Sequence, residues 1–198
     1  MTRSLLVRFA MLALAMVMAI AIAFVLRPGP EVCRWPSPEL VRSGGVLYRN
    51  HREWSGFVER HYPSGGLKER SRYRQGRRSA RSVTYHEGGT QASERFFRDG
   101  HKNGAQRGWW PNGRMKFSRV YVRGRAQGMA TEWYDSGQRA TVHRYVDGKE
   151  DGRQEGWTQD GRIHFNYEIV DGRRYGLIGS KPCFTIRNAA SDLDLDEL

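Results

Sequence analysis

The sequence has few of the residues from which catalytic, metal-binding and disulfide-rich proteins are built. Only two of its 198 residues are cysteine, which excludes a disulfide-dense scaffold. The six histidines follow no H-x-x-x-H spacing and no cysteines are closely paired, so we predict no metal site. The sequence also has no glycine-rich phosphate loop and no nucleophile elbow. It therefore predicts no catalytic residues, no enzyme activity, no cofactor and no small-molecule substrate.

Helix-like hydrophobic periodicity is missing between Gly45 and Gly179, and there is one long apolar run. This run, residues 9–26, has no charge and follows Arg3 and Arg8. Its length is just sufficient to span a bilayer, and basic residues before such a run favour an N-terminus that stays inside.

We interpret residues 1–27 as a single-pass signal anchor in the inner membrane of a bacterium, with the rest of the chain in the periplasm. A cleaved signal peptide is an open alternative, because Ala21-Ile22-Ala23 offers a small-x-small cleavage site. The protein would then be secreted or periplasmic. A buried helix of a soluble protein is the third alternative.

The most informative feature present is a 24-residue repeat. Its copies begin at Gly56, Ala80, Gly104, Gly128 and Gly152, with a partial copy at Gly176. Counting from these residues as position 1, positions 10 and 21 are glycine in all five full copies. Positions 6 and 18 are each aromatic in four of the five. A fixed period of this size is typical of a repeat architecture.

Each copy reads as a β-hairpin. β-Prone residues flank Pro111-Asn112-Gly113, and Asp-Gly pairs such as Asp147-Gly148 lead into the next copy. The predicted fold is therefore all-β: an elongated, single-layer antiparallel β-meander of 24-residue hairpins, after an N-terminal transmembrane or signal helix. Each copy would advance the sheet by about 10 Å, which is twice the spacing of neighbouring strands.

The predicted domain organisation follows composition. Residues 28–45 are rich in proline and glycine and are interpreted as a linker. Residues 46–180 form the repeat domain, with Val46–Ser55 as a capping strand. Residues 181–198 are a C-terminal cap and an acidic tail that ends in SDLDLDEL.

The repeat resembles the MORN repeat, and more closely the variant in bacterial YwqK-type antitoxin proteins. The pattern is G-x-x-x-x-aromatic-aromatic-x-N-G followed by an apolar strand, and the segments 109–113 and 133–137 match it best. The resemblance covers about residues 56–176. It implies a sheet-like interaction module with no catalytic residues. Position 3, often tryptophan in that family, departs from the pattern, and the copy that begins at Ala80 is degenerate.

Charge and aromatic residues point to a binding partner. Residues 56–127 carry 17 Lys+Arg against 5 Asp+Glu, whereas residues 128–176 carry 7 against 9. A basic half fits an anionic partner, or simply a solvated surface that discourages edge pairing. The aromatic columns fit a thin structural core or an exposed binding strip. The candidate interaction residues are Trp109, Trp110, Trp133, Tyr134, Trp157, Arg72, Arg74, Arg98, Arg119 and Arg123.

These observations favour a non-enzymatic protein-interaction module of the bacterial envelope, and the family resemblance implies antitoxin-like or immunity-like sequestration of a partner protein. The first alternative is a peripheral binder of anionic lipid headgroups, and a weaker one is an enzyme of the cell wall. Nucleic acid is disfavoured as a partner, because an exported chain seldom meets it.

The two cysteines, Cys33 and Cys183, form a candidate disulfide, because an exported protein meets an oxidising compartment. They flank an array expected to be about 50 Å long, far beyond the reach of a disulfide unless the linker folds back along the sheet. An intramolecular bond, free thiols and an intermolecular bridge all remain open.

Overall fold

The computed structural model describes residues 16, 18 and 30–179 of the chain. The chain divides into two compact units, residues 1–32 and 33–198, which are described separately. Most of the apolar run 9–26 lies outside the described residues. Among the residues that are described, no helix is long and apolar enough to cross a membrane. Between residues 30 and 179, every element is a β-strand.

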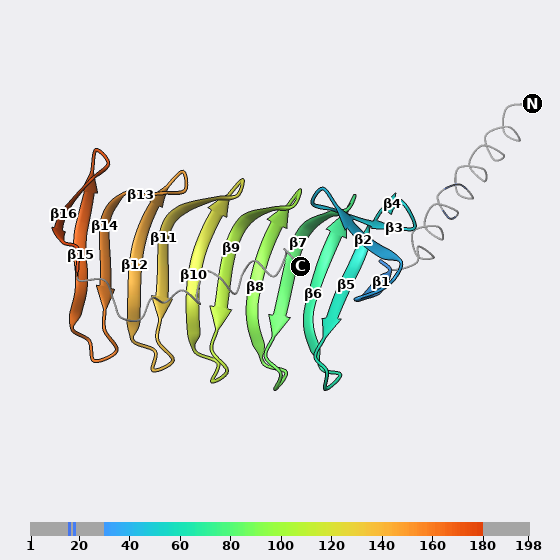
Figure 1. The fold of residues 1–198 in the computed structure, drawn as a ribbon, viewed down its shortest axis with the longest axis horizontal. Helices are drawn as coiled ribbons and strands as arrows, with labels where there is room; N and C mark the ends of the chain where they lie inside the picture. Colours follow the sequence, from blue (N-terminus) through green and yellow to red (C-terminus); the bar gives the residue numbers. More distant parts are fainter. Residues whose placement is uncertain (1–15, 17, 19–29, 180–198) are drawn as a thin grey trace, which may run out of the picture. The chain divides into compact units, whose positions relative to one another are not determined.

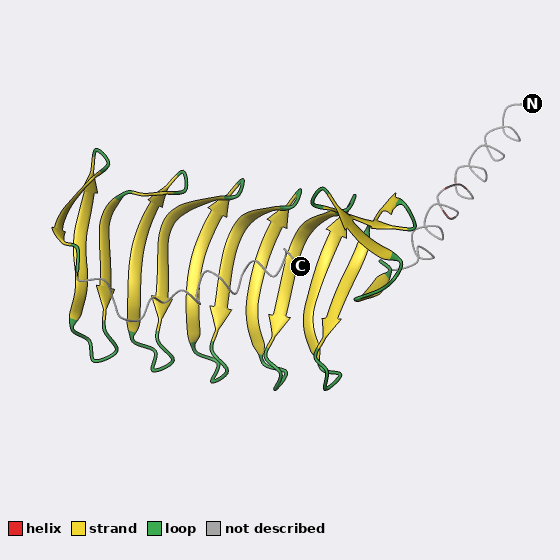
Figure 2. Ribbon diagram, in the orientation of Figure 1, coloured by secondary structure: helices red, strands yellow, loops and turns green. Residues whose placement is uncertain are grey.

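One long sheet holds most of these strands, and they lie side by side in a single row (Figure 1). From β5 to β16 the sheet is an antiparallel meander of strands joined by short loops (Figure 2). The short β13 pairs only with β12. In spatial order the strands are β1 Val32–Trp35, β5 Gly56–His61, β6 Leu67–Arg74, β7 Arg77–Tyr85, β8 Gln91–Arg98, β9 His101–Trp109, β10 Met115–Val122, β11 Arg125–Trp133, β12 Arg139–Val146, β14 Gly152–Trp157, β15 Ile163–Val170 and β16 Arg173–Leu177, with β13 Lys149–Glu150 beside β12. This topology confirms the predicted all-β antiparallel meander.

The glycine at position 10 closes the loop within each hairpin. In the third copy Gly113 N–H donates to the Trp110 carbonyl (2.8 Å), and Trp110 N–H donates to the Arg114 carbonyl (2.8 Å). Gly113 has a φ of +82°, whereas Asn112 is not among the residues with positive φ. The connection is therefore a three-residue loop with one left-handed residue, rather than a two-residue Asn-Gly turn.

The glycine at position 21 closes the two-residue turns between copies. Asp99 and Gly100 have φ values of +52° and +84°, which is the geometry of a type I′ turn. Gly100 N–H donates to the carbonyl of Arg78, which follows the preceding turn (2.9 Å), and the same bond recurs at Gly124 and Gly148. These bonds join the first four turns to one another. We term the border of the sheet that carries all five turns the turn edge.

Position 1 forms a bulge that the sequence pattern alone did not identify. The pairing of β8 with β9 shifts between Arg95 and Phe97, opposite this position. Gly104 and Gly128 have φ values of +102° and +75°, which a side chain disfavours. Ala80, at the one copy start without glycine, is held at a φ of +61°.

Replacing Ala80 by glycine is therefore expected to stabilise the protein. The left-handed conformation costs alanine about 1–2 kcal/mol, whereas glycine loses about 0.5–1 kcal/mol more backbone entropy on folding. We expect a net gain of about 0.5–1 kcal/mol in the free energy of unfolding, measured by denaturant titration. The matched change Gly128→Ala should destabilise by a similar amount. Equal stability of wild type and both variants would contradict a bulge at position 1.

A second, small sheet caps the first hairpins. It contains β2 Leu40–Ser43, β3 Val46–Arg49 and β4 Arg52–Glu53. The segment expected to be a linker, residues 28–45, therefore contributes β1 and β2. The segment expected to be one capping strand forms β3 and β4 instead. Cys33 and Leu40 are the buried apolar residues through which the proline-rich segment packs as strands.

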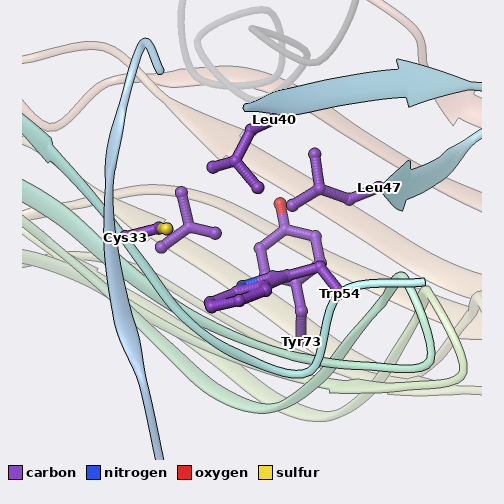
Figure 3. Packing of buried hydrophobic residues seen from close by; sticks show 6 residues of the cluster. Cys33, Leu40, Leu47, Trp54 and Tyr73 are labelled. Atoms are coloured by element: carbon purple, nitrogen blue, oxygen red, sulfur yellow. The ribbon is translucent and has the colours of Figure 1, made fainter. Parts of the chain in front are cut away.

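The largest apolar core lies beneath this cap. Cys33, Leu40, Leu47 and Trp54 converge on Tyr73, with Val58 completing the cluster (Figure 3). Leu47 is 1% exposed. Cys33 packs there as a small apolar side chain. Cys183 lies outside the described residues, as do the predicted C-terminal cap and acidic tail, so the disulfide stays a prediction.

Candidate interaction surface

Side chains of the long sheet point to two faces. The N-terminal cap packs on one face, where it contacts Val58 of position 3 and Tyr73 of position 18. The other side chains of this face are those of positions 5, 14, 16 and 23. We term it the cap face. The opposite face, which we term the open face, carries the side chains of positions 2, 4, 15, 17, 19 and 22. Ion pairs join three of these positions, since Glu94 (position 15) pairs with Arg81 (position 2) and Arg107 (position 4).

Buried polar groups on the cap face bind one another. The Glu69 carboxylate accepts hydrogen bonds from the Arg78 guanidinium (2.8 Å) and the Ser71 hydroxyl (2.6 Å). Further along, the half-buried Arg119 guanidinium pairs with Glu132. Breaking such a pair leaves an uncompensated charge away from water. Arg119 is therefore engaged within the sheet, and it is the weakest of the predicted interaction residues.

Position 3 is the most buried column of the repeat. Its residues are Val58, Ser82, Gln106, Ala130 and Gln154, all between 0 and 6% exposed. The Gln154 amide donates to the carbonyls of Arg144 (3.1 Å) and Gly152 (3.3 Å), next to the bulge. It thereby satisfies backbone acceptors where the ladder is interrupted. The departure from tryptophan at this position thus has a structural role in that copy.

The tryptophans of position 6 are only half-buried. Trp109, Trp133 and Trp157 end strands β9, β11 and β14. Trp109 faces Met115, and Trp133 faces Arg139, across their hairpins. These rings are less buried than position 3, and part of each remains exposed on the protein surface.

The residues of position 7 link each copy to the next. In the first four copies this residue carries a side-chain donor that reaches the carbonyl of position 6 in the following copy, whereas the Thr158 hydroxyl of the fifth copy donates within its own loop, to the Arg162 carbonyl (3.1 Å). The bonds join Tyr62 Oη to the Tyr85 carbonyl (2.8 Å), His86 Nε2 to the Trp109 carbonyl (3.0 Å), Trp110 Nε1 to the Trp133 carbonyl (3.0 Å) and Tyr134 Oη to the Trp157 carbonyl (2.8 Å). Trp110 and Tyr134, predicted to be interaction residues, thus connect copies.

Removing the Tyr134 hydroxyl tests this link. Burial, with a smaller contribution from the Asp160 charge, raises the pKa of the Tyr134 phenol, so it is a donor at neutral pH. Tyr134→Phe is expected to cost about 1 kcal/mol of unfolding free energy, the typical value of one hydrogen bond. Tyr175→Phe, on an exposed tyrosine of β16, should cost almost nothing. Equal effects of the two changes in denaturant titrations would argue against the link.

The remaining predicted arginines lie on the open face or at its border. Arg72, Arg74 and Arg98 are exposed, and Arg123 is exposed in the turn between β10 and β11. In the described part of the chain, none of the four has a carboxylate within 4.0 Å. Arg74 faces Arg77 across a hairpin. Like charges opposite one another are unfavourable, so an anionic partner would relieve their repulsion.

Exposed aliphatic residues, which the repeat pattern did not mark as binding candidates, occupy the open face in the later copies. They are Val120, Val122, Met129, Val146 and Val170, between 41 and 54% exposed. One column of the repeat does indicate this change in the sequence: position 19 is arginine in the first two copies and valine in the last three. Their placement on the same face as the arginines makes the open face both cationic and apolar.

The described residues contain no group of three or more His, Cys, Asp or Glu side chains that could hold a metal ion.

The fold and these surfaces define an all-β repeat protein. No family model matches the chain, and no curated protein matches it. Among solved structures it is similar to one described as "Crystal structure of GtfA/B complex bound to UDP and GlcNAc", with 13% identity and a TM-score of 0.23. The match covers 78% of this chain and 26% of that one, so this chain spans about a quarter of the other's length. A likeness at this score carries no argument about function.

Proposed function

We propose that this protein is a non-enzymatic interaction module that binds a partner protein through the open face. The observation that carries the proposal is the group of exposed aliphatic residues in copies three to five, bordered by arginines without carboxylate partners. Several exposed apolar side chains gathered on one face among polar residues are typical of protein-binding sites. Arginine beside apolar surface is also enriched where proteins bind one another.

The resemblance to MORN-type and YwqK-type repeats supports an antitoxin-like or immunity-like role, in which the module sequesters its partner. The apolar run 9–26 supports attachment to a bacterial inner membrane, with the repeats in the periplasm. A reporter fused after Leu198 is expected to be active only if it is a periplasmic type. Activity of a cytoplasmic-type reporter would overturn this localisation.

Charge substitutions on the open face test the binding function. Proteins would be captured from envelope extract with three full-length proteins: wild type, the double variant Val122→Glu/Val146→Glu, and the single variant Ile163→Glu. Ile163 is a matched control, because it is an exposed aliphatic residue at the opposite end of its strand from the turn edge. We expect the partner to be retained by wild type and Ile163→Glu, and lost from the double variant. Direct binding of the purified partner should then weaken at least about tenfold, or 1.4 kcal/mol.

If the double variant captures the same proteins with the same affinity, the open face is not the binding surface.

A second candidate function, peripheral binding of anionic lipid headgroups, is favoured by the exposed Arg72, Arg74 and Arg98. Vesicle sedimentation separates the two functions. Headgroup binding should require anionic rather than zwitterionic vesicles, fall steeply with ionic strength, and weaken in Arg74→Ala/Arg98→Ala. Binding through the aliphatic surface should depend little on salt.

A further inference from the structure

Along the turn edge, positions 19 and 22 form one row of ten exposed side chains on the open face. They pair directly across each turn as Arg74 with Arg77, Arg98 with His101, Val122 with Arg125, Val146 with Lys149, and Val170 with Arg173. A Cβ added at Gly148 would lie 3.6 Å from the Arg125 Cβ, so position 22 contacts the next turn. The first four pairs, from Arg74 to Lys149, therefore continue from copy to copy as one surface, whereas a Cβ at Gly172 meets nothing within 4 Å, so the pair of Val170 with Arg173 lies at the end of the row without this contact. We term the five pairs the turn-edge row.

The turn-edge row combines cations with aliphatic side chains. In the last three copies each valine alternates with a lysine or arginine. Of the row's six lysine and arginine residues, only Arg125 has a carboxylate within 4.0 Å in the described part of the chain, that of Asp147. A complementary ligand would carry several negative charges interspersed with aliphatic groups.

The chain itself contains such a sequence. Residues 191–198 read SDLDLDEL, with four acidic residues and three leucines. Eleven residues lie between Gly179, the last described residue, and Ser191. Extended, they could reach about 40 Å. Gly179 lies beside His164 and Phe165, at the opposite end of β15 from the turn edge, so about 20 Å of this reach runs along the strands. The row advances about 10 Å with each copy, so the segment can still reach the last three copies.

We propose that residues 191–198 bind the turn-edge row of their own chain, at Val122, Arg125, Val146, Lys149, Val170 and Arg173. Four carboxylates meet three cations, and leucines meet valines. A tethered segment has an effective concentration of about 1 mM, so even weak contacts would keep the row occupied. If the open face binds a partner as proposed above, the segment competes with that partner, and only this competition rests on the proposed function.

Binding of the segment can be tested without any partner. A labelled SDLDLDEL peptide would be titrated by fluorescence anisotropy into two proteins: the full chain, and a variant that ends at Ala190. At low ionic strength we expect the truncated variant to bind the peptide at least about tenfold more tightly, because its own segment no longer competes. High ionic strength should weaken this binding.

Three matched controls make the test specific. Arg125→Glu/Lys149→Glu/Arg173→Glu in the truncated variant should abolish peptide binding. Arg139→Glu should leave peptide binding unchanged, because Arg139 is an exposed arginine at the end of β12 that lies away from the turn edge. A peptide with lysine in place of every acidic residue should bind the triple variant and not the truncated parent. All four substituted residues of the protein are exposed, so unchanged melting temperatures should show that the variants fold.

The proposal is overturned if the peptide fails to bind the truncated variant, or binds it no better than the full chain. It is also overturned if the triple variant binds the peptide as tightly as its parent. Loss of peptide binding would leave partner capture through Val122 and Val146 unaffected, so failure here is distinguishable from failure of the proposed function.

Discussion

Replacing Gly108 by threonine is expected to destabilise the repeat array by about 3 kcal/mol. Gly108, at position 5, lies opposite Phe117, at position 14. A Cβ on Gly108 would lie 2.2 Å from Phe117 Cε1, well inside any real contact. The ring must therefore leave its place on the cap face, where it is 6% exposed. Overpacking of this kind typically costs 1–3 kcal/mol and occasionally more. Chemical denaturation would measure the change.

A second substitution should restore part of this loss. The preceding copy has Thr84 and Ser93 at the same two positions, joined by a hydrogen bond between their hydroxyls (2.6 Å). Gly108→Thr/Phe117→Ser reproduces that pair. The double variant should lose about 2 kcal/mol less unfolding free energy than the two single variants lose when their losses are added. This difference is within the range measured for residues in contact. Gly88→Thr is the matched control, because a Cβ there meets nothing within 4 Å. Additive single changes would disprove the steric pairing.

Replacing Gly76 by valine is expected to detach the N-terminal cap. A Cβ at Gly76 would lie 2.2 Å from Val46 Cγ1 and 2.8 Å from the Leu47 carbonyl oxygen. The turn also bonds the cap directly, since Leu47 N–H donates to the Gly76 carbonyl (2.8 Å) and Gly76 N–H donates to the Trp54 carbonyl (2.8 Å). The φ of +68° adds backbone strain. We expect a total loss of about 4 kcal/mol, from strain and overpacking together.

The matched control is Gly172→Val, at the same position of the last full copy. Its φ is +74°, but a Cβ there meets nothing within 4 Å. It should lose only the strain contribution, about 1–3 kcal/mol. Hydrogen exchange at the Leu47 and Trp54 amides should accelerate in Gly76→Val and not in Gly172→Val. If the two variants lose equal stability and protect these amides equally, the cap does not depend on close approach to the turn.

Local backbone geometry was the part of this fold that could best be predicted from the sequence. The glycines of positions 10 and 21 recur because each turn requires a left-handed residue, whatever surrounds it. Gly113 and Gly148 have that geometry. The hairpin order followed, because short turns force neighbouring strands to pair. The bulge at position 1 had the same kind of signal, yet a glycine column does not state whether it marks a turn, a bulge or a close approach.

Contacts between copies could not be predicted from the sequence in the same way. Tyr134 reads as an aromatic residue available for binding, but its hydroxyl bonds to the Trp157 carbonyl 23 residues away. Arg119 reads as a surface cation, but position 16 points to the cap face and pairs with Glu132. Which cations stay unpaired depends on which face each position occupies. That depends in turn on the bulges, because one extra residue changes the alternation of side chains.

The sequence by itself determined the repeat, its period, its turns and its meandering β-sheet, because these depend on interactions within about 24 residues and on φ values that only glycine adopts easily. Only the tertiary structure decided where the cap packs, which aromatic residues join copies, and that valines and arginines share the open face. These outcomes depend on strand register and on contacts between distant segments, such as Val46 against Gly76, which no local pattern encodes.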